Sequence, residues 1–144
     1  MRILVLGGGT FVGRALVESA LAAGHTVTTF TRSTPPPGAE SGAVEAVFGD
    51  RTTSAGLRLL DGRAWDAVFD TWSGAPRVVR DAVSALRERV PYYGYVSSCS
   101  VYCEPTPAGA DESHPAVEAE PGAGLTYYPA DKRGAELAVL EGFG

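Results

Sequence analysis

The chain has 144 residues, of which 44% are hydrophobic and 20% are charged, as expected for one packed domain rather than a disordered or fibrous chain. Its net charge of −5 argues against nucleic-acid binding, because affinity for a duplex comes mainly from Lys and Arg beside phosphates. No apolar run approaches the roughly 20 residues of a membrane helix, and glycines follow the first six residues too early for a signal peptide. We therefore expect a cytoplasmic protein with no nucleic-acid partner and no membrane contact.

Two cysteines, Cys99 and Cys103, are present in the sequence. They are too few for a disulfide framework, and no histidine or second cysteine pair stands at a zinc-binding spacing. We predict no metal site and favour a structural role for both.

Short apolar runs alternate with amphipathic segments along the chain. Residues 3–6 form a continuous apolar run that ends at glycine, which is typical of a strand buried on both faces. Residues 11–23 predict a helix, because apolar residues recur four apart. The face that we expect to pack on the sheet consists of Val12, Leu16 and Ala20.

The remaining elements follow the same logic. Runs rich in β-branched or apolar residues predict further strands over residues 26–31, 44–48, 67–70 and 93–97. Helical spacing predicts helices over residues 53–60, 76–89 and 125–140. In the second of these helices we expect Val79, Val83 and Leu86 to face inward. Segments rich in Pro and Gly predict loops over residues 33–42 and 104–124.

The connections between consecutive strands are too long for hairpins, which implies right-handed βαβ crossovers. We therefore predict an α/β fold of the Rossmann type, a doubly wound parallel sheet of about five strands in order 3-2-1-4-5 with helices on both faces. The whole chain, residues 1–144, is interpreted as one domain.

A glycine-rich segment, residues 7–13, joins the first strand to the first helix. At this junction the free N–H groups and the dipole of the helix start favour a phosphate. Gly7 permits the tight turn, a small residue near Gly9 lets the backbone approach phosphate, and Gly13 lets the helix pack against the strand. We predict that the pyrophosphate of NAD(P) is bound by Gly7, Gly9, Thr10, Phe11, Val12 and Gly13. The alternative is a glycine turn with no ligand.

Residues after the second and third strands are expected to contact the adenosine half of the cofactor. An acid after the second strand would bind the ribose hydroxyls of NAD, but the residue here is Arg32, which can pair with the 2′-phosphate of NADP. NADP is therefore favoured and NAD remains possible; the alternative is a solvated arginine. Asp50 could accept a hydrogen bond from the adenine amino group or cap the next helix.

Tyr128 and Lys132 stand four residues apart, so on a helix they share one face. Tyrosine in water has a pKa of about 10 and is a poor base, but an adjacent ammonium and a cationic nicotinamide stabilise the phenolate. Tyr128 could then move a proton while the cofactor moves a hydride. Taken alone, this pair is common and more often has no catalytic role.

Ser98 follows the fifth predicted strand, at the carboxyl edge where open α/β sheets bind ligands. Its hydroxyl could hydrogen-bond a substrate oxygen and stabilise charge there. The alternative is a serine that satisfies backbone groups after a strand.

With these motifs the sequence resembles the short-chain dehydrogenase/reductase superfamily, specifically its extended and atypical NAD(P)-dependent epimerase/dehydratase members. The resemblance spans the chain and is carried by residues 7–13, 49–51, 65–70, 95–102 and 128–132. It implies that Tyr128 is the acid/base, that Lys132 also binds the nicotinamide ribose, and that Ser98 polarises the substrate oxygen. Arg51, beside Asp50 in one of these motifs, is assigned to the cofactor site as well.

Two departures from the family pattern shape our expectations. Most members have glycine at the position of Thr10, so this loop points to the atypical branch. Members also continue into a C-terminal lobe that selects the substrate, and we expect this chain to be a fragment, to act with another chain, or to have lost turnover. The fifth strand would then be an apolar sheet edge, so we expect a homo-oligomer or self-association.

The leading interpretation is an oxidoreductase or epimerase-type domain that couples proton transfer by a Ser-Tyr-Lys set to hydride transfer. Its substrate would be a sugar nucleotide or another small carbonyl or alcohol. The rival interpretation is a non-catalytic dinucleotide-binding module or an inactive, truncated member. The complete Ser-Tyr-Lys set favours catalysis, and the missing substrate lobe favours the rival.

Overall fold

One five-stranded parallel sheet forms the centre of the computed structural model, which describes residues 1–33, 35, 36 and 38–144. Its order is β3-β2-β1-β4-β5, and each neighbouring pair is parallel. The strands are β1 (Arg2–Leu6), β2 (Thr26–Thr31), β3 (Val44–Phe48), β4 (Ala67–Asp70) and β5 (Tyr93–Tyr95). The predicted α/β fold of the Rossmann type, with strand order 3-2-1-4-5, is confirmed.

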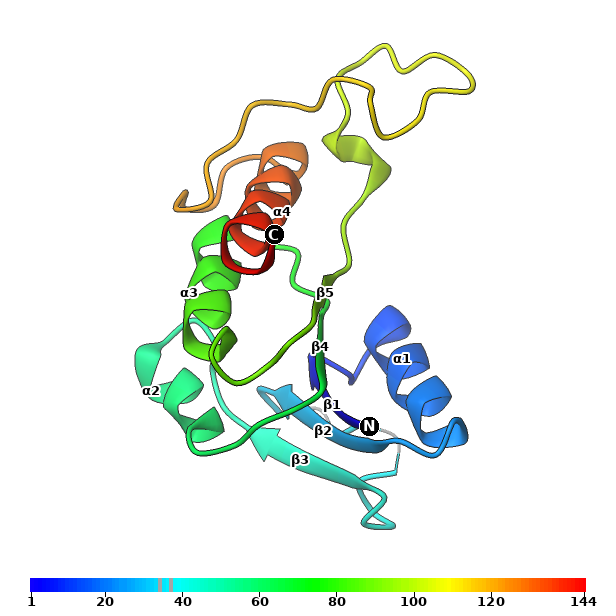
Figure 1. The fold of residues 1–144 in the computed structure, drawn as a ribbon, viewed down its shortest axis with the longest axis vertical. Helices are drawn as coiled ribbons and strands as arrows, with labels where there is room; N and C mark the ends of the chain where they lie inside the picture. The colour runs from blue at the N-terminus through cyan, green and yellow to red at the C-terminus, as the bar shows by residue number, and fades with distance from the viewer. Residues whose placement is uncertain (34, 37) are drawn as a thin grey trace.

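Helices cover both faces of this sheet, as predicted. Figure 1 shows α1 (Phe11–Ala22) on one side of the sheet and the other helices on the opposite side. These are α2 (Ser54–Leu57) with the 3-10 turn η1 (Arg58–Leu60), α3 (Pro76–Leu86) and α4 (Tyr128–Phe143). A second 3-10 turn, η2 (Cys99–Val101), follows the last strand.

The core has two layers, one on each face of the sheet. Successive side chains of a strand point to opposite faces, so Ile3 and Val5 pack on the α1 side whereas Leu4 and Leu6 pack on the α3 side. This arrangement explains why β1 is a continuous apolar run. In α3 the expected inward residues Val79, Val83 and Leu86 are all buried.

The buried face of α1 differs from the prediction. Gly13 and Val17 are its buried residues, whereas Val12 is 38% exposed, and Leu16 and Ala20 are only half-buried. The predicted face is therefore rotated by about one residue. The reason is Gly13, whose lack of a side chain lets the helix approach the loop before it, an effect that a search for apolar side chains misses.

The last helix also begins later than predicted, at Tyr128 rather than residue 125. Tyr127 is extended, with φ −119° and ψ 152°, and Pro129 lies in the first turn, where its missing N–H costs nothing. Of the predicted loop over residues 33–42, Thr34 and Pro37 lie outside the described residues, and the rest contains no helix or strand. Residues 104–124 also form no helix or strand, apart from one bridge between Tyr102 and Ala116.

The described residues offer neither a membrane span nor a metal site. No helix there is long and apolar enough to cross a membrane. No group of three or more His, Cys, Asp or Glu side chains there is placed to hold a metal ion, and both cysteines are free.

Candidate functional site

A cleft of about 480 Å³ opens at the carboxyl end of the sheet. This is the edge where open α/β folds bind their ligands. Four segments line the cleft: residues 6–10, 30–33, 49–51 and 71–73. They bring together most of the residues predicted to bind the cofactor, namely Gly7, Gly9, Thr10, Arg32, Asp50 and Arg51, and α1 continues directly from this wall with Phe11, Val12 and Gly13.

The glycine-rich loop has a backbone conformation that leaves no room for side chains at several of its positions. Gly7 and Gly8 have φ of +124° and +104°, where residues with a Cβ are strained. A Cβ on Gly7 would collide with the Thr71 hydroxyl, and a Cβ on Gly13 would stand 2.6 Å from the amide nitrogen of Gly8. The sequence interpretation did not single out Gly8, although its buried backbone is part of the same turn.

The first turn of α1 leaves its N–H groups available to a ligand. Thr10 occupies the N-cap position without a side-chain hydrogen bond, and the first helical bond runs from Arg14 N to Thr10 O, at 3.0 Å. An α-helix has no internal partner for the N–H groups ahead of that bond. Phe11 is 91% exposed with φ +25°, and it is the one non-glycine residue with positive φ among those described. Such strain is concentrated at functional sites.

Arg32 and Asp50, which were predicted to contact the adenosine half of the cofactor, both line the cleft. Arg32 follows β2 and is exposed. Asp50 Oδ1 accepts hydrogen bonds from the Thr52 hydroxyl at 2.7 Å and from the Thr52 amide at 2.9 Å. These bonds lower the pKa of Asp50, and the charge of Arg32 lowers it further. The cap of α2 is Thr53, which accepts from Gly56 N at 3.0 Å, so Asp50 does not have the capping role that was its alternative.

Arg51 lines the cleft, but its guanidinium faces the interior of the protein. It forms two hydrogen bonds of 2.6 Å with the carboxylate of Asp70, and the side chains are 8% and 0% exposed. The Arg51 guanidinium also lies 5.3 Å from the centre of the Trp72 ring. Its Nε has no partner among the described residues. Arg51 therefore contributes to the wall of the cleft, but its guanidinium is buried and paired with Asp70 rather than exposed to a ligand.

Asp70 was not identified from the sequence as a site residue. Burial alone would raise its pKa, but the charge and hydrogen bonds of Arg51, with further bonds from Tyr93 and the Trp72 amide, lower it instead. The available signal was an acidic residue at the end of a buried apolar strand, where an unpaired carboxylate is costly. That signal implies a partner for Asp70 but does not say which one.

Ser98 stands directly before the short 3-10 turn η2, and Tyr128 is the first residue of the long helix α4. Ser98 caps η2, where its Oγ accepts from Ser100 N at 3.2 Å and lies 2.9 Å from Ser100 Oγ. This bonding corresponds to the backbone role that was the alternative for Ser98. Tyr128 is the first residue of α4 and is 48% exposed, so its side chain reaches solvent.

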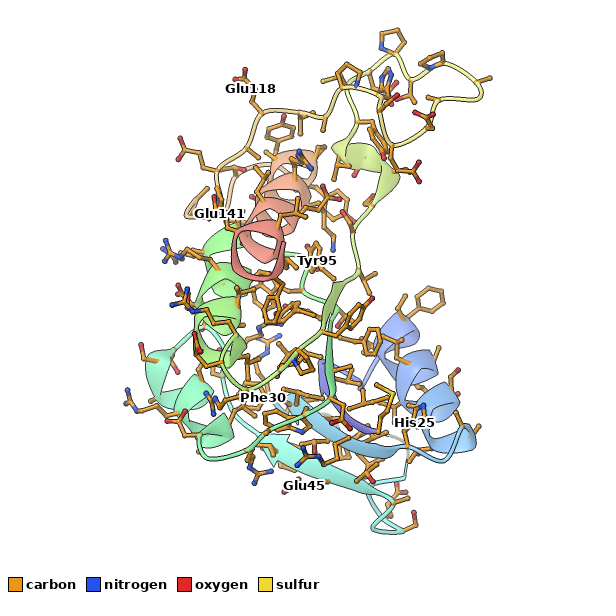
Figure 2. All side chains as sticks on the ribbon, viewed as in Figure 1. His25, Phe30, Glu45, Tyr95, Glu118 and Glu141 are labelled. Carbon is orange, nitrogen blue, oxygen red and sulfur yellow. The ribbon has the colours of Figure 1, made fainter. Side chains whose placement is uncertain are left out.

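Lys132 lies one turn further along α4 and is only 3% exposed. Its Nζ donates to the carbonyl oxygens of Trp72 at 2.8 Å and Val96 at 2.7 Å, and lies 4.7 Å from the centre of the Tyr95 ring. Figure 2 shows Tyr95 between the end of β5 and α4. Burial lowers the pKa of Lys132, while the negative charges of Asp70 and Glu136 oppose that shift. Lys132 is also the single lysine of the sequence.

Two of the three predicted catalytic residues lie on α4, and the third follows β5. Within the described part of the chain, no hydrogen bond joins Ser98, Tyr128 and Lys132 to one another. Lys132 instead contacts Val96, two residues before Ser98. The arrangement leaves one of the three Nζ donors of Lys132 for a further partner.

Residues 3–141 match the family described as the NAD dependent epimerase/dehydratase family. A search of curated proteins gave no significant match.

Several solved structures share this fold. WbmG from Bordetella bronchiseptica, in complex with NAD, is 20% identical with a TM-score of 0.78 over 99% of this chain and 50% of that chain. MoeE5, in complex with UDP-glucose and NAD, is 22% identical with a TM-score of 0.73 over 98% and 48%. A short-chain dehydrogenase/reductase from Veillonella parvula, in complex with NADP, is 15% identical with a TM-score of 0.69 over 99% and 64%. The chain spans about half the length of the first two.

Proposed function

The chain belongs to the NAD dependent epimerase/dehydratase family, and we propose that residues 1–144 form the dinucleotide-binding Rossmann domain of an NAD(P)-dependent epimerase, dehydratase or reductase. The observation that carries the proposal is the turn before α1. There the positive φ of Gly7 and Gly8 and the close approach of Gly13 leave a backbone that opens onto the cleft. Backbone N–H groups at such a turn favour a diphosphate.

Each part of such a cofactor has a proposed partner, although Lys132 is not among the residues that line the cleft. The pyrophosphate would be held by Gly7, Gly9, Thr10, Phe11, Val12 and Gly13. Arg32 would pair with the 2′-phosphate of NADP, Asp50 would accept a hydrogen bond from the adenine amino group, and Lys132 would contact the nicotinamide ribose. We therefore favour NADP over NAD. Arg51 would support the floor of the cleft, because its guanidinium is bonded to Asp70.

The nicotinamide supplies hydride transfer when it is bound. The remaining residues would transfer the proton that accompanies this step. Ser98 would hydrogen-bond the substrate oxygen, and the Tyr128 hydroxyl would exchange a proton with it. Lys132 would stabilise the Tyr128 phenolate by its charge. Its two backbone hydrogen bonds fix the ammonium in place before substrate arrives.

The substrate class that we propose is a sugar nucleotide, or another small molecule with a carbonyl or alcohol. The UDP-glucose bound to MoeE5 supports the first choice. Because this chain spans about half the length of such structures, we propose that further protein, from a longer chain or a second copy, completes the substrate site.

A second candidate is a dinucleotide-binding module without catalysis. Two observations favour it: the Ser98 hydroxyl is engaged with Ser100, and two of the Lys132 donors are engaged with backbone carbonyls. Both candidates require the cofactor, so turnover distinguishes them and binding does not.

Fluorescence titration with NADPH and with NADH tests the proposal. We expect both to bind, with NADPH the tighter because of Arg32. Absence of binding by either at concentrations below about 1 mM, where the binding free energy is only about −4 kcal/mol, would contradict both candidates.

A further inference from the structure

We propose that Asp70 is a positioning residue: it holds Trp72 and Val96, whose carbonyls accept hydrogen bonds from the Lys132 ammonium. Through the Arg51–Asp70 pair, the adenosine side of the cleft is linked to this lysine. The inference deepens the proposed function and rests on it for the role of Lys132. Asp70 is fully buried at the end of β4, so it acts through its neighbours and not on a substrate.

The carboxylate of Asp70 has a fixed orientation because both of its oxygens are saturated. Oδ1 accepts from Arg51 at 2.6 Å and from the Trp72 amide at 2.9 Å. Oδ2 accepts from Arg51 and from the Tyr93 hydroxyl, each at 2.6 Å. Four donors from three residues therefore hold one carboxylate, and moving it would leave buried groups without partners.

Both acceptors of the Lys132 ammonium are in turn held by Asp70. The Asp70 side chain binds the N–H of Trp72, and the carbonyl of Trp72 accepts from Lys132 at 2.8 Å. The Asp70 main-chain carbonyl binds the N–H of Val96 at 2.9 Å, and the carbonyl of Val96 accepts from Lys132 at 2.7 Å. Asp70 thus fixes the residue on each side of the ammonium, once through its side chain and once through its backbone.

Tyr95 also contacts the Lys132 ammonium and one of its acceptors. Its hydroxyl donates to the Trp72 carbonyl at 2.9 Å, and its ring lies beneath the ammonium. The charged groups that face Lys132 are Asp70 on β4 and Glu136 on α4. Burial lowers the pKa of Lys132, and these two charges oppose that effect, so the charge of Asp70 acts together with its geometry.

The same carboxylate reaches the adenosine side through Arg51. Arg51 follows Asp50 directly in the loop after β3 and lies against the Trp72 ring, and all three residues line the cleft. A dinucleotide that orders this loop would therefore act on residues that also set the position of Lys132.

The single lysine makes the test direct. In the full chain labelled with ¹⁵N- and ¹³C-lysine, the side chain of Lys132 gives one set of NMR signals, and the hydrogen exchange of its ammonium reports its two hydrogen bonds. We compare wild type with Asp70→Asn and with the double variant Arg51→Met/Asp70→Leu. The double variant is the safeguard against unfolding, because replacing both partners of a buried ion pair by apolar residues is often tolerated. The control, Arg80→Met/Asp81→Leu, removes the exposed pair on α3 in the same way.

We expect exchange of the Lys132 ammonium to accelerate by at least about tenfold in the double variant, as loss of an ordered hydrogen bond implies. We also expect the dissociation constant for NADPH to rise by at least about tenfold. The control should change neither quantity. A folded double variant with unchanged lysine exchange would overturn the proposal, even if its NADPH affinity fell.

The outcome for the proposed function is read separately. If wild type binds no dinucleotide but the lysine signals respond as expected, the proposed function fails and the link from Asp70 to Lys132 stands. If wild type binds NADPH and the lysine signals do not respond, the link fails and the proposed function stands.

Discussion

Gly13 approaches Gly8 so closely that a methyl group on residue 13 would stand 2.6 Å from the Gly8 amide nitrogen and 2.9 Å from its Cα. Backbone atoms on both sides of this contact cannot move aside as a flexible side chain would. The geometry of the turn before α1 therefore depends on glycine at residue 13.

Replacing Gly13 by alanine should displace this turn. We expect Gly13→Ala to lower the free energy of unfolding by about 1–3 kcal/mol through overpacking, and to raise the dissociation constant for NADPH by at least tenfold, about 1.4 kcal/mol. Urea unfolding and fluorescence titration measure the two effects. The control is Gly124→Ala, whose Cβ meets no atom within 4 Å. Wild-type stability and affinity in Gly13→Ala would contradict this account of the turn.

Arg32 should determine the preference for NADP. We expect Arg32→Gln to weaken NADPH binding by about ten- to a hundredfold, the value of a charge-assisted hydrogen bond, and to change NADH binding little. Paired titrations with the two cofactors measure the ratio. Arg77→Gln, which removes an exposed arginine of α3, should leave the ratio unchanged. An equal loss for both cofactors would instead assign Arg32 a general electrostatic effect.

Tyr128 should be required for turnover and not for cofactor binding. We expect Tyr128→Phe to reduce kcat by about 10²- to 10⁴-fold for any substrate that the complete enzyme turns over, with little change in NADPH affinity. The neighbouring exposed residue offers a matched control, Tyr127→Phe, which should keep wild-type kcat. If Tyr128→Phe retained its rate, Tyr128 would be removed as the acid/base.

Removing one member of the Arg51–Asp70 pair should destabilise the folded protein more than removing both. Asp70→Asn leaves the Arg51 charge buried without its partner, which should cost about 3–5 kcal/mol. Arg51→Met/Asp70→Leu should cost less, because it leaves no buried charge unpaired and only the Tyr93 hydroxyl and the Trp72 amide lose their acceptor. Urea unfolding of the three proteins at neutral pH measures this. An Asp70→Asn protein as stable as wild type would show that the carboxylate charge does not matter.

The same pair should make the free energy of unfolding decrease as the solution becomes acidic. The pKa of Asp70 is lowered in the folded state. As the pH falls, the unfolded chain, in which this pKa has its ordinary value of about 3.9, therefore binds a proton before the folded chain does. This stabilisation is present above that pH and is lost as pH falls through the lowered pKa. Between about pH 3 and about pH 6, wild type should therefore lose more stability than Arg51→Met/Asp70→Leu. Asp50 and Asp111 also have lowered pKa values, but they remain in both proteins and cancel.

The fifth strand should make the 144-residue chain self-associate. β5 pairs with β4 on one side, and no strand among the described residues pairs with its other side. Open edges of this kind attract further strands, and charge on them opposes pairing. Tyr92 is the exposed residue directly before β5. In light scattering we expect association that Tyr92→Lys reduces and that Leu125→Lys, a change at an exposed residue outside the strands, does not. A monodisperse wild-type monomer would be inconsistent with this expectation.

The features that the sequence predicts well are those encoded by neighbouring residues. Alternating strands and helices imply the parallel sheet and its order, because crossover connections allow few topologies. Gly7 and Gly13 mark the turn before α1, since their spacing and position after a strand are local properties. Even there, the buried face of α1 was misplaced, because Gly13 is buried without being apolar.

The features that the sequence did not reveal depend on pairs that meet only after folding. Arg51 and Asp70 are 19 residues apart, and Lys132 is 60 residues from Trp72. Motif spacing identified Lys132 but not the carbonyls that hold it. Those contacts follow from the register of β4 beside β5 and from the packing of α4, which no local pattern contains.

The backbone N–H groups at the start of α1 should bind a diphosphate, and a crystal structure with NADP tests this most directly. We expect the two phosphates to lie within hydrogen-bond distance of the amides of Phe11, Val12 or Gly13, with the 2′-phosphate beside Arg32. A dinucleotide bound elsewhere, or a turn left empty at saturating NADP, would contradict the account.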